Sequence, residues 1–181
     1  MYIHHSDEGL SSRVKGIPSI FLAGPSPRGR GEGFPADWRD EAFKLFEQKE
    51  FSGRLFVPRP TTGNAKTYAG RIEWELHHLD LADCIMFWVP RKAPDMLGQT
   101  TNVEYGLYLK CDRVVYGRPD DALQIRYLDH IGRKYAKIEP LNSLEATIDA
   151  AMVLSYKRAK EGFVPRMLRW FKVLRRVTPR F

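Results

Sequence analysis

The stretch that decides the fold covers residues 81–106 and reads LADCIMFWVPRKAPDMLGQTTNVEYG. Its first part, residues 83–90, is apolar without alternation, which is typical of a strand covered on both faces. After an irregular loop, the pattern predicts a helix that begins at Thr100 or Thr101 and carries Glu104 in its first turn. Open α/β sheets bind ligands just past the carboxyl ends of their strands, so Glu104 is the principal candidate for a functional residue.

Two interpretations of Glu104 are open from its spacing. A carboxylate in the first turn of a helix is stabilised as an anion by about 0.3–1 kcal/mol, which suits a nucleophile better than a general acid. Alternatively, the run from Thr101 to Glu104 fits the capping box S/T-x-x-E, in which the glutamate only satisfies the helix N-terminus. The spacing favours neither interpretation over the other.

The composition is that of a single globular domain. The 181 residues are 43% hydrophobic and contain no apolar run long enough to span a membrane, which predicts a folded domain. The first 16 residues lack an apolar signal core, so we expect a polar lead-in to a cytosolic protein. Cys84 and Cys111 lie in or beside apolar runs without a CxxC motif, and we expect buried, reduced thiols.

The net charge of +7 is a property of the C-terminal end. From Lys157 onward there are nine Lys or Arg and one acidic residue, whereas residues 1–156 hold 20 basic and 21 acidic residues. We therefore divide the chain into a domain, residues 1–156, and a basic tail, residues 157–181, and a nucleic-acid role for the whole chain loses its support. Within the tail, residues 165–177 predict a basic amphipathic helix that packs on a neighbouring subunit, an anionic membrane or nucleic acid.

Strand and helix patterns alternate along the chain, which predicts an α/β fold with a doubly wound parallel sheet and helices on both faces. On the second helix Ile72, Leu76 and Leu79 are expected to face inward. On the third helix Val103 and Leu107 are expected to do so, with Tyr108 as a further candidate. The predicted strands are residues 18–23, 54–58, 83–90, 113–116 and 134–138, and the predicted helices are residues 37–50, 68–80, 100–110, 120–132 and 143–156.

The loop after the first predicted strand, residues 24–35, reads GPSPRGRGEGFP. Ser26, Arg28 and Arg30 supply hydroxyl and guanidinium donors, and arginine matches the geometry of phosphate. Both arginines could equally be solvated. His77 and His78 lack further ligands at suitable spacing, so no metal site is expected.

Four motifs in order resemble the nucleoside 2-deoxyribosyltransferases and their nucleotide N-hydrolase relatives. They are I-F-L-A-G-P from Ile20, W-R-x-E-A from Trp38, L-A-D-C-I-M-F-W-V-P from Leu81 and T-N-V-E-Y-G from Thr101. The resemblance extends over residues 19–116, and more loosely to about residue 151. It implies a flavodoxin-like fold of about five strands, a nucleoside or nucleotide substrate and a homo-oligomer, and it implies no cofactor.

The resemblance also implies roles for three acidic residues. Glu104, followed by Gly106, corresponds to the glutamate that attacks the anomeric carbon of the sugar. The family's second acid lies eight residues before Asp83, which is Glu75, and it would handle the proton of the leaving base; Glu75 could instead be an ordinary solvated residue. Asp83 at the strand mouth could orient a catalytic partner or only cap a turn.

The resemblance implies that Gly24, Pro25 and Ser26 close over the sugar or base, while Arg28 and Arg30 make a 5′-monophosphate an option. The sequence departs from the family at Gly98, where the transferases have an aspartate, and at Phe21, where some members have an aromatic hydroxyl. Gln99 or Asn102 is expected to take over base or sugar contacts, although Asn102 could simply occupy the first turn of the helix.

These expectations describe an enzyme that cleaves the N-glycosidic bond of a 2′-deoxynucleoside or its 5′-monophosphate and transfers the deoxyribosyl group to another base or to water. The alternative is a non-catalytic nucleotide-binding module on the same fold, associated with a membrane or nucleic acid through the basic tail.

Overall fold

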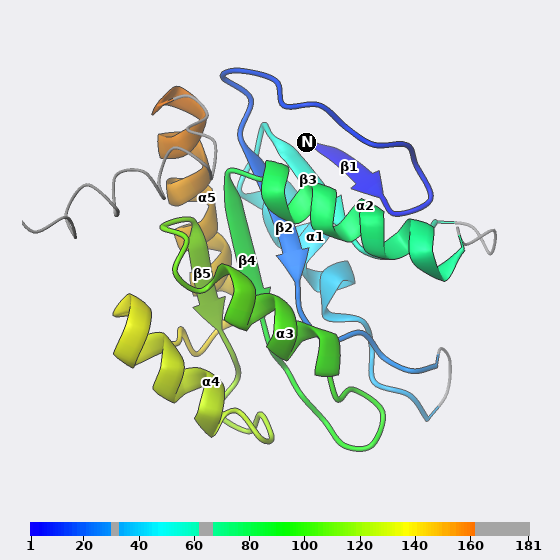
Figure 1. Cartoon of the computed structure of the whole chain (residues 1–181), viewed down its shortest axis with the longest axis vertical. Helices are drawn as coiled ribbons and strands as arrows, with labels where there is room; N and C mark the ends of the chain where they lie inside the picture. Colours follow the sequence, from blue (N-terminus) through cyan, green and yellow to red (C-terminus); the bar gives the residue numbers. More distant parts are fainter. Residues whose placement is uncertain (30–32, 62–66, 162–181) are drawn as a thin grey trace, which may run out of the picture.

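The computed structural model describes residues 1–29, 33–61 and 67–161. Its strands form one five-stranded sheet. The strands are β1 (Tyr2–His5), β2 (Ser19–Ala23), β3 (Arg54–Val57), β4 (Cys84–Trp88) and β5 (Val114–Gly117). All neighbours pair in parallel, in the order β1-β3-β2-β4-β5 (Figure 1). Without β1, the order of the remaining strands is that of the first four strands of a flavodoxin-like sheet, so the predicted α/β fold is confirmed.

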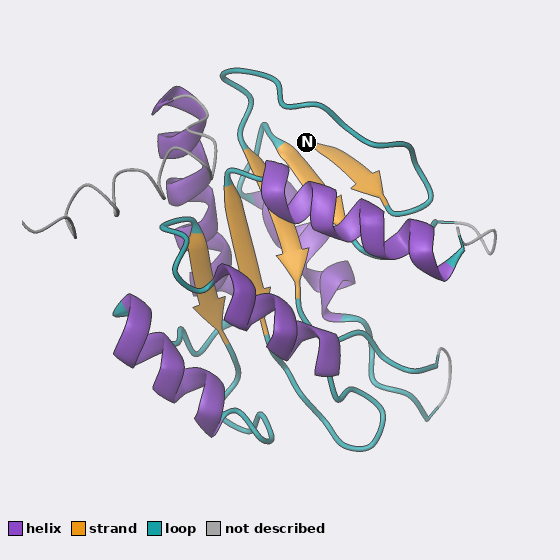
Figure 2. Cartoon of the chain, viewed as in Figure 1, coloured by secondary structure: helices purple, strands orange, loops and turns teal. Residues whose placement is uncertain are grey.

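Helices cover both faces of the sheet (Figure 2). On one face lie α1 (Trp38–Gln48) and α5 (Leu144–Glu161), and on the other lie α2 (Tyr68–Leu81), α3 (Gln99–Tyr108), α4 (Arg126–Ile131) and the π-helical turn η1 (Gly132–Ala136). Successive residues of β2 alternate between the two cores: Ile20 and Leu22 face the first, and Phe21 faces the second. A fully buried strand of this kind requires the continuous apolar run seen in the sequence.

Two predicted helix caps are confirmed. Asp37 caps α1 by accepting a hydrogen bond from the Arg39 backbone N–H at 3.1 Å, and Ser143 precedes α5 and accepts one from Ala146 at 3.2 Å. Cys84 is buried, Cys111 is half-buried, and both are free thiols. Within the described residues, no helix is both long and apolar enough to cross a membrane.

The two ends of the sheet differ from the prediction. The N-terminus was expected to be a polar lead-in, but Tyr2–His5 forms the edge strand β1 beside β3. Residues 134–138 were expected to form the last strand; residues 132–136 instead form η1, and the chain returns to the sheet only in a single bridge between Leu141 and Gly117. β1 escapes prediction because its burial comes from distant partners: His4 stacks on Trp74 of α2.

The inward faces of two helices were predicted only in part: Leu79 and Tyr108 are buried as expected, but their neighbours differ. α2 buries Trp74, His78 and Leu79, which leaves Ile72 and Leu76 exposed at 41% and 43%. In the same way α3 buries Thr101, Tyr105 and Tyr108, whereas Val103 and Leu107 are 61% and 52% exposed. The aromatic side chains fill the space above the sheet, so each helix is rotated away from its aliphatic stripe.

The predicted tail helix, residues 165–177, lies outside the described residues. Helix α5 reaches Glu161 and therefore continues through the expected domain boundary at residue 156.

Candidate active site

Two adjoining pockets open at the carboxyl ends of the strands. The inner pocket has a volume of about 280 Å³ and the outer pocket about 950 Å³, and they share Ser26, Pro58 and Glu75. The residues that line the inner pocket are Gly24, Pro25, Ser26, Arg28, Arg39, Pro58, Glu75, Leu97, Gly98, Gln99, Thr100, Thr101 and Glu104. The structure thus brings together Glu104, Glu75, Gln99 and the predicted loop residues Gly24, Pro25, Ser26 and Arg28.

Glu104 projects into the inner pocket from the middle of α3. The helix begins at Gln99 after Gly98, whose φ of 61° is left-handed, and no side chain caps it. Glu104 is therefore the sixth residue of the helix rather than part of its first turn, and the capping-box interpretation is wrong. Its carboxylate is left to line the pocket.

The pKa of Glu104 is raised to about 7, chiefly because the carboxyl is buried and also because Glu75 lies nearby, while Arg39 opposes the shift. The expectation that the helix N-terminus keeps Glu104 ionised is therefore wrong. Burial also raises the pKa of Glu75, against the charges of Arg39 and Arg71. Both carboxyl groups are therefore easier to protonate than an exposed glutamate.

Arg39, which the sequence analysis did not single out, carries a positive charge to the wall of the inner pocket. Its side chain has no exposed surface, and its Nη2 donates to the Gly24 carbonyl at 2.8 Å and to the Leu22 carbonyl at 3.2 Å. Its Nη1 donates to Ser26 Oγ at 3.1 Å and to Asp37 at 3.2 Å. Arg39 shares the buried side of α1 with Ala42 and Phe46, and an arginine in that apolar register was the available signal.

The loop between β2 and α1 is held close to the end of β4. A Cβ on Gly24, whose φ is 149°, would lie 2.1 Å from the Trp88 carbonyl oxygen, so only glycine fits there. The Pro25 carbonyl accepts a hydrogen bond from Trp38 Nε1 at 3.0 Å. The Arg28 backbone N–H donates to the Asp95 carbonyl at 2.8 Å, which ties this loop to the one before α3. Arg30 lies outside the described residues.

Two predicted site residues lie elsewhere. Asp83 directly precedes β4 and lies at the amino ends of the strands, away from both pockets. Its buried carboxylate accepts hydrogen bonds from Ser19 Oγ at 2.9 Å and from Arg13 at 2.6 Å. Asn102 Oδ1 accepts a hydrogen bond from Arg91 at 2.6 Å, and its side chain lines neither pocket. Both side chains are occupied by structural partners.

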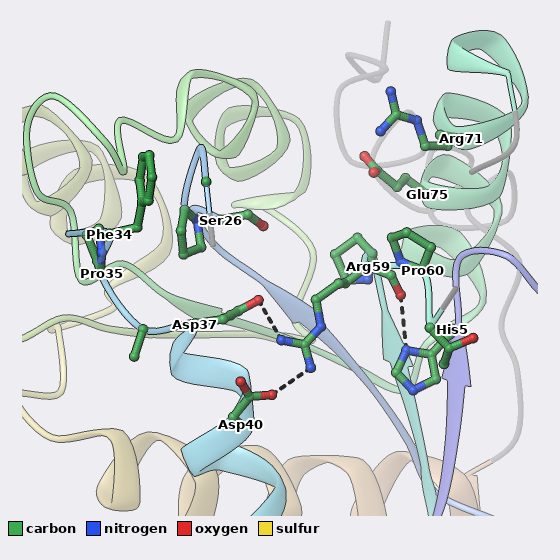
Figure 3. A pocket seen from close by; sticks show the side chains of 15 residues that line it. His5, Ser26, Phe34, Pro35, Asp37, Asp40, Arg59, Pro60, Arg71 and Glu75 are labelled. Atoms are coloured by element: carbon green, nitrogen blue, oxygen red, sulfur yellow. Dashed lines mark hydrogen bonds and ion pairs between the residues drawn. The ribbon is translucent and has the colours of Figure 1, made fainter. Parts of the chain in front are cut away.

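The outer pocket has a polar wall that is already satisfied and a second wall on α2 (Figure 3). Arg59 is held between Asp37 at 2.9 Å and Asp40 at 2.7 Å, and its carbonyl oxygen pairs with His5 Nδ1 at 3.0 Å. Arg71 and Glu75 project from α2 toward the cavity. Across the part of the chain that the structure describes, no group of three or more His, Cys, Asp or Glu could hold a metal ion.

This arrangement can combine nucleophilic attack with proton transfer. Two carboxyl groups with raised pKa values in one pocket can hold a single proton between them, which leaves one ionised and the other able to act as an acid. No cofactor is required for such chemistry.

One comparison with known proteins identifies a family. A model of the family described as "Nucleoside 2-deoxyribosyltransferase like" matches residues 17–122, more than half of the chain. The matched segment runs from β2 to β5 and includes Glu75, Glu104 and the loop after β2. Among curated proteins, none matches the sequence of this chain.

Proposed function

Because the chain belongs to the nucleoside 2-deoxyribosyltransferase-like family, we propose that it cleaves the N-glycosidic bond of a 2′-deoxynucleoside or its 5′-monophosphate. Glu104 is the nucleophile and Glu75 the acid that protonates the leaving base. The observation that carries this proposal is that both carboxyl groups line the inner pocket at the carboxyl edge of the sheet, each with a raised pKa.

The proposed reaction proceeds in two steps. An ionised Glu104 oxygen attacks C1′ as the C1′–N bond breaks, the electron pair of that bond goes into the ring of the base, and a ring nitrogen of the base, N7 in a purine, takes the proton of Glu75. In the second step, another base or water attacks C1′, gives its proton to Glu75, and releases Glu104 as a carboxylate. A base as acceptor makes the protein a transferase, and water makes it a hydrolase.

The active form of the pair holds one proton. The transition state of N-glycosidic cleavage carries positive charge at C1′, which stabilises the anion of the carboxylate beside it. We therefore expect the proton to reside on Glu75 once substrate is bound. Glu75 is well placed to deliver it, because it borders both pockets and so stands between the sugar and the departing base.

A 5′-monophosphate is the form of substrate that the inner pocket supports best. Gly98, Gln99 and Thr100 line it at the N-terminus of α3, where no side chain caps the free N–H groups. The exposed Arg28 lines the same pocket, and the structure gives its side chain no ion pair within the described residues. A helix N-terminus and a guanidinium together suit a phosphate.

The Arg28 role is tested by substitution. Arg28→Ala should raise KM for a monophosphate about tenfold or more and leave KM for the matching nucleoside nearly unchanged, because only the monophosphate carries the charge that arginine binds. Equal effects on the two substrates would remove Arg28 from phosphate binding.

The proposed chemistry is tested by incubating the protein with deoxynucleosides and their monophosphates, with and without a second free base. Glu104→Gln should abolish release of free base while the fold persists, since the neutral amide replaces a carboxyl group that burial already disfavours as an anion.

Glu75→Gln should slow release most for bases that need protonation. A folded wild-type protein that binds these compounds but cleaves none would be a binding module instead.

The homo-oligomer, the contacts of the basic tail and a cytoplasmic location stay predictions.

A further inference from the structure

Arg71 lines the outer pocket, and its guanidinium makes no ion pair with the described residues. Its Nε is buried, and among the described residues it has no hydrogen-bond partner. Its charged group lies 5.7 Å from the centre of the Tyr68 ring, so an aromatic face supports it from one side. The other arginine of this pocket, Arg59, already pairs with Asp37 and Asp40. Arg71 is therefore the cation of the outer pocket that is available to a ligand.

The position of Arg71 relative to Glu75 identifies which part of a substrate it meets. Arg71 lines only the outer pocket, Glu104 lines only the inner pocket, and Glu75 lines both. If the sugar carbon lies beside Glu104 and the base takes its proton from Glu75, the base extends toward Arg71. Residues four apart on a helix lie on the same face, and Figure 3 shows both side chains projecting to the same side.

The edges of the purine bases differ in what they offer such a pair. Guanine presents two adjacent acceptors, N7 and O6, and hypoxanthine shares that edge; adenine presents N7 beside an amino group that only donates. A carboxylic acid at N7 with a guanidinium at the neighbouring position matches two acceptors. Facing adenine, the same guanidinium would meet an amino group. Both groups are hydrogen-bond donors, so no hydrogen bond forms between them.

We propose that Arg71 hydrogen-bonds the 6-oxo group of the leaving base and makes the enzyme selective for 6-oxopurine deoxynucleotides over adenine deoxynucleotides. This inference rests on the proposed function. Arg71 is a specificity-determining residue here, because it contacts the base rather than the bond that breaks.

The sharpest test uses two substrates that differ only at O6: 2′-deoxyinosine 5′-monophosphate and the purine 2′-deoxyriboside 5′-monophosphate that lacks O6. In Arg71→Met, kcat/KM for the 6-oxo substrate should fall about tenfold or more, because a good arginine–base contact is worth at least that factor, while the value for the other substrate stays within about threefold. Arg71→Lys should give an intermediate ratio. Arg126→Met is the matched control, because Arg126 is an exposed residue of α4 that lines neither pocket.

Three outcomes would overturn the inference. Equal loss on both substrates would mean that Arg71 acts through the charge of Glu75. With the two matching nucleosides assayed beside them, a loss confined to the monophosphates, whatever the base, would assign Arg71 to phosphate. An Arg71→Met variant with wild-type kcat/KM for both substrates would leave Arg71 without a role in base selection.

If the wild-type protein cleaves no substrate, the proposed function fails by itself. The base contact is then measured separately, as the affinity of Glu104→Gln for the same two compounds with and without Arg71→Met. Affinity for the 6-oxo compound that drops about tenfold on loss of Arg71 supports the contact, and equal affinities reject it.

Discussion

Arg39 lies within electrostatic reach of both active-site carboxyl groups, and its hydrogen bonds go to main-chain carbonyls, Ser26 and Asp37 rather than to Glu75 or Glu104. Its charge nonetheless lowers the pKa of each, against the burial that raises both. A residue that touches neither carboxyl group therefore adjusts the pH at which the pair holds one proton. Arg39 thus acts on the reaction through the two glutamates and not through the substrate.

The pH profile of kcat/KM follows from this arrangement. Activity on a deoxynucleoside, which has no phosphate to titrate, should fall as pH rises through about 7, where the pair loses its last proton, and also in acid, where the pair gains a second one. Removing the charge in Arg39→Gln raises both pKa values, so the whole bell should move to higher pH.

Arg39→Lys keeps the charge and is the control; its profile should remain close to that of the wild-type protein. Circular dichroism checks that each variant is folded. A profile for folded Arg39→Gln that coincides with the wild-type profile would contradict the electrostatic role.

At the scale of elements, the two ends of β4 have different tasks. The carboxyl end leads toward the inner pocket, whereas Asp83 precedes the amino end and joins β2 to the N-terminal segment through Ser19 and Arg13. Since ligands of open α/β sheets bind at the carboxyl edge, Asp83 contributes to stability rather than to chemistry.

Substituting Asp83 separates these tasks. Asp83→Ala should lower the free energy of unfolding by about 3 kcal/mol or more in urea denaturation, because it removes the buried carboxylate that binds Arg13 and accepts from both the backbone N–H and the hydroxyl of Ser19. Below the unfolding transition, kcat/KM should stay within about twofold. Asp112→Ala, which removes an exposed ion pair with Arg158, is the matched control and should cost less than about 1 kcal/mol. A large loss of kcat in folded Asp83→Ala would return Asp83 to the mechanism.

At the scale of the whole molecule, the N-terminal segment connects the sheet edge to the helix that carries Glu75. His4 of β1 stacks on Trp74 with ring centroids 5.7 Å apart, and the Ser11 backbone N–H donates to His78 Nε2 at 3.2 Å. His5 of the same strand lines the outer pocket. The position of α2, and so of Glu75 and Arg71, depends on a segment more than 60 residues away in sequence.

Deleting residues 2–5 tests this dependence. The deletion should lower the midpoint of thermal unfolding by about 5 °C or more, since it exposes the aromatic side of α2, and it should lower kcat/KM through misplacement of Glu75. Truncation after Glu161 is the comparison: it keeps every described residue of both cores and both pockets, and we expect the midpoint and kcat/KM to stay unchanged. A deletion of β1 with wild-type activity would show that α2 holds its position alone.

The sequence by itself determined the alternation of strands and helices, the parallel sheet, and the two glutamates, because these depend on local periodicity and on short motifs whose order could be compared with a family. Asp37 and Ser143 were likewise predictable as helix caps, since a cap acts on backbone groups only a few residues away. Gly98 was not, because the neighbour that a Cβ at this position would meet, Pro25 at 2.8 Å, comes from another loop.

Only the tertiary structure decided which faces α2 and α3 bury, that β1 joins the sheet, that Arg39 lies beside the two carboxyl groups, and that Glu104 has a pKa near 7. Each of these depends on side chains that are distant in sequence and meet only when the sheet and helices pack. Burial and electrostatic coupling arise from that meeting, so no window of the sequence contains them.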